Sequence, residues 1–180
     1  MFQHFQSPEY FLMKEVFRSK NMEQYLAHIV EEFIYQDVKT YHDNGQIKKK
    51  YRTKYGLIDG EYNEWHENGQ LKVQAWYVNG DNCGQENSWY EGGQIHEQIT
   101  YVDGNRHGEH KFWYNNGELM YLMPYVDGKE HGEHKLWYDD GKLMSLTTYV
   151  NGQKHGTYQE WYENGKLDIH KTYVDGVLIH

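Results

Sequence analysis

The sequence predicts a mainly β protein, an elongated and twisted antiparallel sheet of tandem hairpins preceded by a short helical segment. The first observation is a pair of glycine series that each repeat every 24 residues: Gly45, Gly69, Gly93, Gly117, Gly141 and Gly165, then Gly56, Gly80, Gly104, Gly128, Gly152 and Gly176. The second is that each unit holds two turn signals, which predict two strands. Because a unit this short cannot bury a core alone, neighbouring units must stack.

Three columns of residues define each hairpin. The first is tryptophan, with Tyr41 in its place in the first repeat; the second is leucine or isoleucine; the third is tyrosine, followed by valine and an Asn-Gly or Asp-Gly pair. Their members are Trp65, Trp89, Trp113, Trp137 and Trp161, then Ile47, Leu71, Ile95, Leu119, Leu143 and Leu167, then Tyr77, Tyr101, Tyr125, Tyr149 and Tyr173. Twelve strands at about 4.8 Å spacing predict a sheet on the order of 55 to 60 Å long.

The register follows from the turn Glu67-Asn68-Gly69. A two-residue loop would put Trp65 and Leu71 on opposite faces. A three-residue loop, with glycine in the left-handed region as a bulge, puts them directly opposite each other. Because a one-residue slip expels a whole apolar column, we favour the three-residue loop and expect Trp65, Leu71 and Tyr77 to share one face.

Residues 1–36 do not fit the repeat, which we assign to residues 37–180. Ser7-Pro8-Glu9 is typical of a helix start, and Asn21 with Gln24 resembles a second one. Apolar residues follow at helical spacing, which predicts two short amphipathic helices. We expect this segment to cap the sheet or to dock on it.

Composition excludes several functions. The formal net charge of −9 argues against nucleic-acid binding, which depends on a positive field. The single cysteine, Cys83, excludes an intrachain disulfide, and the apolar runs are far shorter than the roughly 20 residues that cross a bilayer. We therefore expect an intracellular, cytoplasmic protein without a transmembrane segment.

The central repeats carry a candidate partner surface on the second face of the predicted sheet. That face is polar in the other repeats, and in the centre it is apolar. Such a patch marks a docking site for the N-terminal helices, for a second copy or for a different partner. Its residues are Phe112, Tyr114, Met120, Leu122, Leu136, Tyr138, Met144 and Leu146.

A candidate site for an anionic partner lies in the first repeat. Lys48, Lys50, Arg52 and Lys54 alternate along one strand, so we expect them on one face with Lys49 on the other. Such a row could receive an acidic protein or a phosphoinositide head group. The alternative is a solvated row that prevents pairing between sheet edges.

Two histidine columns suggest metal binding. His107, His131 and His155 share a column with Cys83, and His110 and His134 form another. Equivalent residues of successive hairpins lie about 9.5 Å apart, whereas nitrogens that share one zinc lie within roughly 3.5 Å. We therefore expect the His-Gly pairs to be solvated turn residues. With no catalytic motif in the sequence either, we expect no metal, no cofactor and no enzyme.

The residues from Gly128 to Leu143, Gly-Lys-Glu-His-Gly-Glu-His-Lys-Leu-Trp-Tyr-Asp-Asp-Gly-Lys-Leu, resemble the variant form of the MORN repeat, and Gly152 to Leu167 match it as well. The resemblance covers about six copies over residues 37–180, although Thr53 and Lys54 depart from the pattern in the first. It implies a row of antiparallel hairpins that serves as a scaffold for protein contacts or docks at membranes, with no defined catalytic residue.

The variant form is common in proteins of a YwqK-like antitoxin family and of giant DNA viruses, where the location would be host cytoplasm or virion. We therefore expect a non-enzymatic protein-interaction scaffold. An antitoxin-like protein that neutralises one toxin is the alternative, and docking at a membrane surface through the basic row is the weaker one. Self-association through the sheet edge or the central patch is also open.

Overall fold

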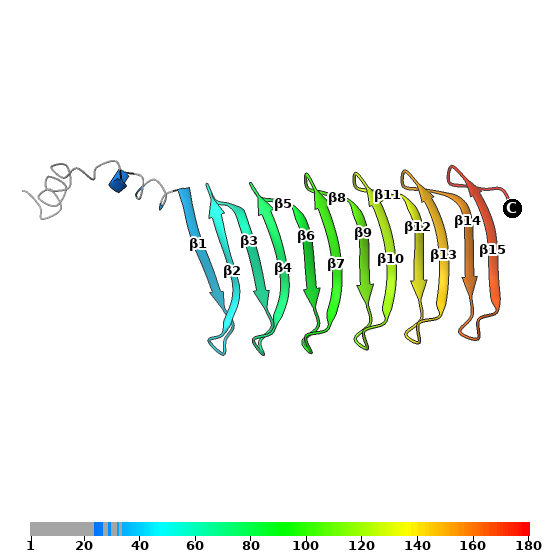
Figure 1. The fold of residues 1–180 in the computed structure, drawn as a ribbon, viewed down its shortest axis with the longest axis horizontal. Helices are drawn as coiled ribbons and strands as arrows, with labels where there is room; N and C mark the ends of the chain where they lie inside the picture. The colour runs from blue at the N-terminus through cyan, green and yellow to red at the C-terminus, as the bar shows by residue number, and fades with distance from the viewer. Residues whose placement is uncertain (1–23, 27–28, 30–31, 33) are drawn as a thin grey trace, which may run out of the picture.

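The computed structural model describes residues 24–26, 29, 32 and 34–180, and it confirms the predicted sheet of tandem hairpins. One open antiparallel sheet of 16 strands extends from Tyr35 to Leu178 (Figure 1). Residues 24–26 are helical, and the other helix predictions for residues 1–36 fall mostly outside the described residues. The first strand begins at Tyr35, just inside that segment.

Twelve long strands alternate in direction along the sheet. They are β1 (Tyr35–Tyr41), β2 (Ile47–Lys54), β3 (Leu57–Trp65), β4 (Leu71–Val78), β6 (Gly84–Trp89), β7 (Ile95–Val102), β9 (Gly108–Trp113), β10 (Leu119–Val126), β12 (Gly132–Trp137), β13 (Leu143–Val150), β14 (Gln153–Trp161) and β15 (Leu167–Val174). Four strands of two residues each complete the sheet: β5 (Asp81–Asn82), β8 (Asn105–Arg106), β11 (Lys129–Glu130) and β16 (Val177–Leu178).

The four short strands explain why the number exceeds the twelve predicted: β16 pairs with β15 after the last turn, and the other three arise from interruptions. Glycines with positive φ, Gly84 (85°), Gly108 (79°) and Gly132 (103°), interrupt the first strand of three repeats. Each interruption leaves a two-residue piece paired to the preceding strand, as β5 pairs with β4. The glycine is required because residues with a Cβ rarely adopt this conformation.

Both turn predictions are confirmed. At the lower rim in Figure 1, Trp65 pairs with Leu71, and the His66 amide donates to the Gln70 carbonyl at 2.9 Å. Gly69 closes the loop with φ of 84°, as a bulged three-residue loop requires. At the upper rim, Asn79 and Gly80 both have positive φ, 51° and 90°. Two such residues in sequence make the type I′ turn that suits strand twist.

The prediction that Trp65, Leu71 and Tyr77 share one face is wrong. Trp65 pairs with Leu71, but the preceding Glu64 pairs with Val73. Lys72 is therefore an extra residue, a bulge that reverses the alternation in the rest of β4, from Val73 onward. Tyr77 consequently lies on the face opposite Trp65 and Leu71.

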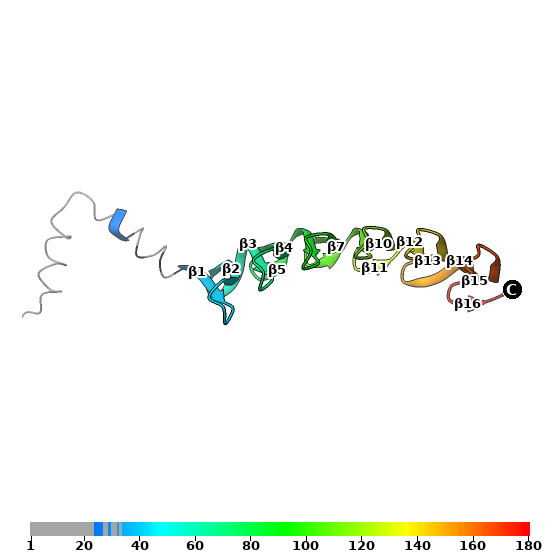
Figure 2. The ribbon, with the colours of Figure 1, turned by 90° about the horizontal axis from the view of Figure 1, so that it is seen from below.

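Two names follow for the faces of the sheet. The tyrosine face carries the columns of Tyr62, Glu64, Lys72, Val73, Ala75 and Tyr77. The tryptophan face carries the columns of Asn63, Trp65, Leu71, Gln74 and Trp76. All the buried residues among those described lie on the tyrosine face, so the thin core sits there: Thr53, Ala75, Ile99, His110, Tyr125, His134, Ser145 and Thr147. Viewed from below, the sheet is a single layer (Figure 2).

Hydrogen bonds between repeats hold the hairpins together at both rims. At the lower rim of the first five repeats, the residue after the tryptophan position reaches the tryptophan carbonyl of the next repeat. Tyr114 donates to Trp137 at 2.9 Å, and Tyr138 donates to Trp161 at 2.8 Å. At the upper rim turn glycines donate backwards, as Gly152 does to the Glu130 carbonyl at 2.8 Å. These bonds join each repeat to its neighbours, as expected for an array stabilised by contacts between adjacent units.

Candidate interaction surfaces

The bulge divides the predicted central surface between the two faces. Phe112 and Leu136 lie on the tyrosine face, in the column of Glu64, while Leu122 and Leu146 lie on the tryptophan face, in the column of Gln74. Met120 and Met144 occupy the bulge position, as Lys72 does. Tyr114 and Tyr138 take part in the lower-rim bonds instead. All eight side chains are half-buried, and they do not form one patch.

The bulged residues point onto the tyrosine face. The Lys72 ammonium donates to Glu64 Oε1 at 2.9 Å, and the His96 ring lies 4.7 Å from that of Phe112. Met120 and Met144 share this column and lie beside the column of Phe112 and Leu136. We call these four residues, Phe112, Met120, Leu136 and Met144, the central apolar cluster.

Phe112 is the aromatic centre of this cluster. Its ring stacks on that of Tyr121, with centroids 4.6 Å apart and planes at 28°. His96 meets Phe112 edge-on, and the His110 ring lies 5.4 Å away. Burial, assisted by the charge of Glu97, raises the pKa of Tyr121 to about 12. The phenol therefore stays neutral, and the cluster presents an aromatic surface at physiological pH.

Two imidazoles in this region are buried, which sequence reasoning missed. His110 and His134 are each 4% exposed, and the Nε2 of His110 lies 2.7 Å from Glu97 Oε1. Burial lowers the pKa of His134. One feature of the sequence pointed to this burial. The column of His110 and His134 holds large aromatic residues, Tyr62 and Tyr158, in the outer repeats, which favours side chains packed against the sheet.

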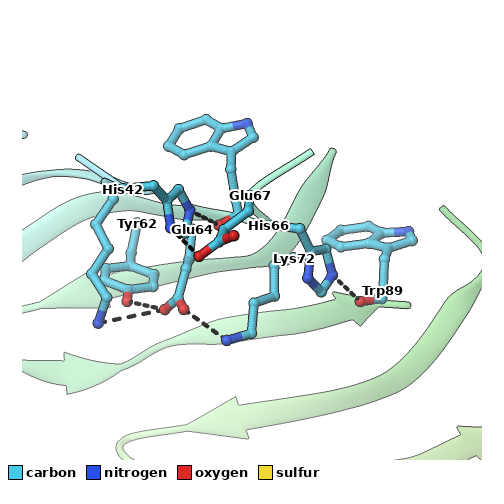
Figure 3. A network of polar contacts seen from close by, with 9 residues as sticks. His42, Tyr62, Glu64, His66, Glu67, Lys72 and Trp89 are labelled. Atoms are coloured by element: carbon cyan, nitrogen blue, oxygen red, sulfur yellow. Dashed lines mark hydrogen bonds and ion pairs between the residues drawn. The ribbon is translucent and has the colours of Figure 1, made fainter. Parts of the chain in front are cut away.

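The same positions are polar towards the N-terminal end of the sheet. Glu64 accepts hydrogen bonds from the Tyr62 hydroxyl and the Lys72 ammonium, both at 2.9 Å (Figure 3). Burial would raise the pKa of Glu64, but the bonds from Lys72 and Tyr62 outweigh it and lower the pKa. Along the tyrosine face, then, a charged network at one end gives way to the apolar cluster in the centre. Figure 3 also shows the lower-rim contact of His66 with the Trp89 carbonyl.

The prediction of four cations in one row is wrong. Ile47 pairs with Tyr41 and Lys49 with Thr40, so Lys48 is the bulged residue and leaves the face that carries Lys50. Lys50, Arg52 and Lys54 remain together on the tryptophan face. Two of these are engaged: Arg52 pairs with Asp37 at 3.0 Å, and Lys54 lies 5.8 Å from the Tyr35 ring centroid.

A shallow hollow of about 940 Å³ lies beside these cations. Its wall includes the indole of Trp76, which is 52% exposed. Charges of both signs line it. The lining residues are Glu32, Tyr35, Asp37, Lys50, Tyr51, Arg52, Asp59, Gly60, Glu61, Asn63 and Trp76.

Two histidines of the upper-rim column lie near carboxylates of the following turn. His107 Nδ1 is 3.5 Å from Asp127, His155 Nδ1 is 3.2 Å from Asp175, and Cys83 is half-buried. Within the described part of the chain, no group of three His, Cys, Asp or Glu residues could hold a metal ion. That same part contains no helix long and apolar enough to span a bilayer.

Six stacked hairpins, one layer thick and bonded at both rims, define a β-hairpin repeat protein. The family model of the MORN repeat variant matches residues 37–55, 58–79, 82–103, 106–127, 130–151 and 154–175. The chain therefore belongs to the MORN repeat variant family, as the motif in its fifth and sixth hairpins predicted. Repeats of this family are of a non-enzymatic type and generally mediate protein or membrane interactions.

Other comparisons add little. No curated protein matches the chain. A solved structure described as "Crystal structure of GtfA/B complex bound to UDP and GlcNAc" is 13% identical, and the match covers 63% of this chain but only 24% of that one. Its TM-score of 0.25 is too low to carry an argument about function.

Proposed function

We propose that this chain is a non-enzymatic protein-interaction scaffold whose partner binds the central apolar cluster on the tyrosine face. The observation that supports it is the change of chemistry along one pair of columns. Glu64, Ser88 and Glu160 occupy the first column outside the cluster, where Phe112 and Leu136 stand inside it. The bulge column changes from lysine and histidine to Met120 and Met144 in the same repeats.

The cluster has the character of a protein-binding surface. Its side chains are half-buried on an open single layer, and the extensive contacts of the described strands are with their neighbours in the sheet. Phenylalanine and methionine are enriched at the centres of protein interfaces, where charged residues are depleted. A partner that covers Phe112 removes its remaining apolar surface from water, which is favourable at about 25 cal/mol per Å².

The test exchanges residues between repeats of the chain itself. Phe112→Ser with Leu136→Glu introduces side chains that Ser88 and Glu64 already place in this column, so the sheet register should persist. The matched control, Leu122→Gln with Leu146→Gln, changes the tryptophan face to the residues of Gln74 and Gln98. Thermal unfolding by circular dichroism first establishes that both variants fold.

The partner is purified with the wild-type chain from its native source and titrated against each variant by calorimetry. We expect at least about tenfold weaker binding for the tyrosine-face variant, because the few residues that dominate binding lie near the centre of an interface and each cost about 2 kcal/mol or more when truncated. The control should bind as the wild type does. The reverse pattern would place the partner on the tryptophan face and refute the proposal.

The same complex separates the scaffold from an antitoxin-like role. A protein that neutralises a toxin should copurify with one small protein at a fixed ratio, and adding it should abolish that protein's toxicity. Sedimentation of the two variants tests self-association through the cluster. Flotation with vesicles tests membrane contact, which the division of the basic row and the net charge of −9 disfavour.

A further inference from the structure

We propose a second binding site, for a peptide segment of a partner protein, on the tryptophan face at the N-terminal end of the sheet. Lys39 and Lys50 hold one acidic side chain of that segment, and Trp76 contacts a neighbouring apolar side chain. The site is separate from the central apolar cluster, so either proposal can fail without the other.

A pair of like charges marks the site. Lys39 on β1 and Lys50 on β2 are direct cross-strand partners. In the next two repeats the same positions hold amides that bond to each other: Gln74 donates to Asn63 at 3.4 Å, and Gln98 donates to Asn87 at 3.1 Å. Like charges directly opposite each other destabilise a sheet. The first repeat therefore lacks a favourable pair and presents two adjacent cations instead.

The neighbouring carboxylate does not neutralise both lysines. Asp37 pairs with the Arg52 guanidinium at 3.0 Å. That hydrogen bond and charge lower the pKa of Asp37, with smaller contributions from Lys50 and Lys39. Both lysines are exposed, and neither forms an ion pair with another described residue. An incoming carboxylate can therefore accept charge-assisted hydrogen bonds from two ammonium groups.

The hollow beside Lys50 supplies the apolar contact. The exposed indole of Trp76 lines this hollow. In later repeats the same column holds smaller residues: Thr100, Pro124, Thr148 and Thr172. Asn63, which pairs with Lys50 on the other side, adds an amide to the wall. Lysines next to a large exposed aromatic ring suit an acidic residue adjacent to an apolar one.

The remaining charges of the hollow select the kind of ligand. They are the carboxylates of Glu32, Asp59 and Glu61. Glu61 lies on the side of Trp76, with which it pairs across the strands. These carboxylates repel a continuous anionic surface, as does the net charge of −9. A peptide with a single acidic residue can place that residue at the two lysines. An anionic lipid surface would also bring negative charge against the carboxylates of the hollow. This charge pattern favours a protein segment over a membrane.

The test uses a blocked tripeptide of one glutamate between two leucines, with the corresponding glutamine peptide as its control. Binding is followed by the NMR shift of the Trp76 indole resonance, which Trp76→Thr assigns by its disappearance. The variant Lys39→Asn with Lys50→Gln installs the amide pair of the second repeat. Lys135→Asn, which changes the Lys39 column in a distant repeat, is the matched control.

We expect the double variant and the glutamine peptide each to weaken binding by about tenfold, from the loss of charge-assisted hydrogen bonds, while Lys135→Asn leaves binding unchanged. The double variant should unfold at the same temperature or higher, because an amide pair replaces two like charges. Equal binding of both peptides, or of wild type and double variant, overturns the proposal. So does binding to phosphatidylserine vesicles that depends on the two lysines in the absence of peptide binding.

Discussion

The lower-rim hydrogen bonds predict that the array loses stability when a single hydroxyl is removed from an interior repeat. In Tyr138→Phe the change deletes the donor to the Trp161 carbonyl, a bond of 2.8 Å between a half-buried side chain and the backbone of the next repeat. The ring remains, so the hydrophobic contacts of the side chain persist. The variant therefore measures one bond between repeats.

The expected cost is about 1 kcal/mol, since a typical net hydrogen bond contributes roughly 0.5 to 1.5 kcal/mol. That corresponds to about a fivefold change in the folding equilibrium constant. The matched control is Tyr162→Phe in the same column of the last repeat. Tyr162 is 49% exposed, and its hydroxyl bonds to the exposed carboxylate of Asp168 rather than to another repeat. We expect the control to cost less than about 0.5 kcal/mol, as exposed surface changes usually do.

Urea unfolding followed by tryptophan fluorescence and by circular dichroism measures both variants against the wild type. Agreement of the two signals establishes that one transition describes the unfolding, which is necessary for an array of repeats. If Tyr138→Phe is neutral, or if Tyr162→Phe costs as much, the bond between repeats does not stabilise the array as argued.

Two further predictions concern the buried histidine and the modularity of the sheet. Because burial lowers the pKa of His134 from 6.5, the unfolded state binds a proton first, and stability should fall as the pH drops below about 6.5. The variant His134→Tyr introduces the residue that Tyr62 and Tyr158 place in the same column, and it should lose less stability than the wild type between about pH 7.5 and pH 5. Equal decreases of the urea midpoint in the variant and the wild type would contradict this. Deleting residues 106–129 removes one full 24-residue unit, so the sheet should still form and unfold cooperatively. Deleting residues 106–130 should prevent this, because the extra residue shifts the strand register by one and exchanges the two faces. Folding of both deletions would refute the assigned register.

The candidate surfaces were predictable only in part. The apolar character of residues 112 to 146 is visible in the sequence, and so are the lysines of the first repeat. Their division between faces is not, because the bulge at Lys48, Lys72, Met120 and Met144 shifts alternation by one residue. Strict alternation therefore puts Lys48 on the wrong face of the basic row. It also merges the central apolar residues of two faces into one patch.

The sequence by itself determined the repeat, the positions of both turns, the three-residue loop and the pairing of Trp65 with Leu71, because glycine spacing and left-handed turn residues act over a few neighbouring positions. Only the tertiary structure decided which face each column occupies and which cations remain unpaired. It also showed that His110 and His134 are buried, since the rings that cover them, such as Tyr121, Tyr125 and Tyr149, come from other strands. Those features depend on contacts between strands, which local turn chemistry does not specify.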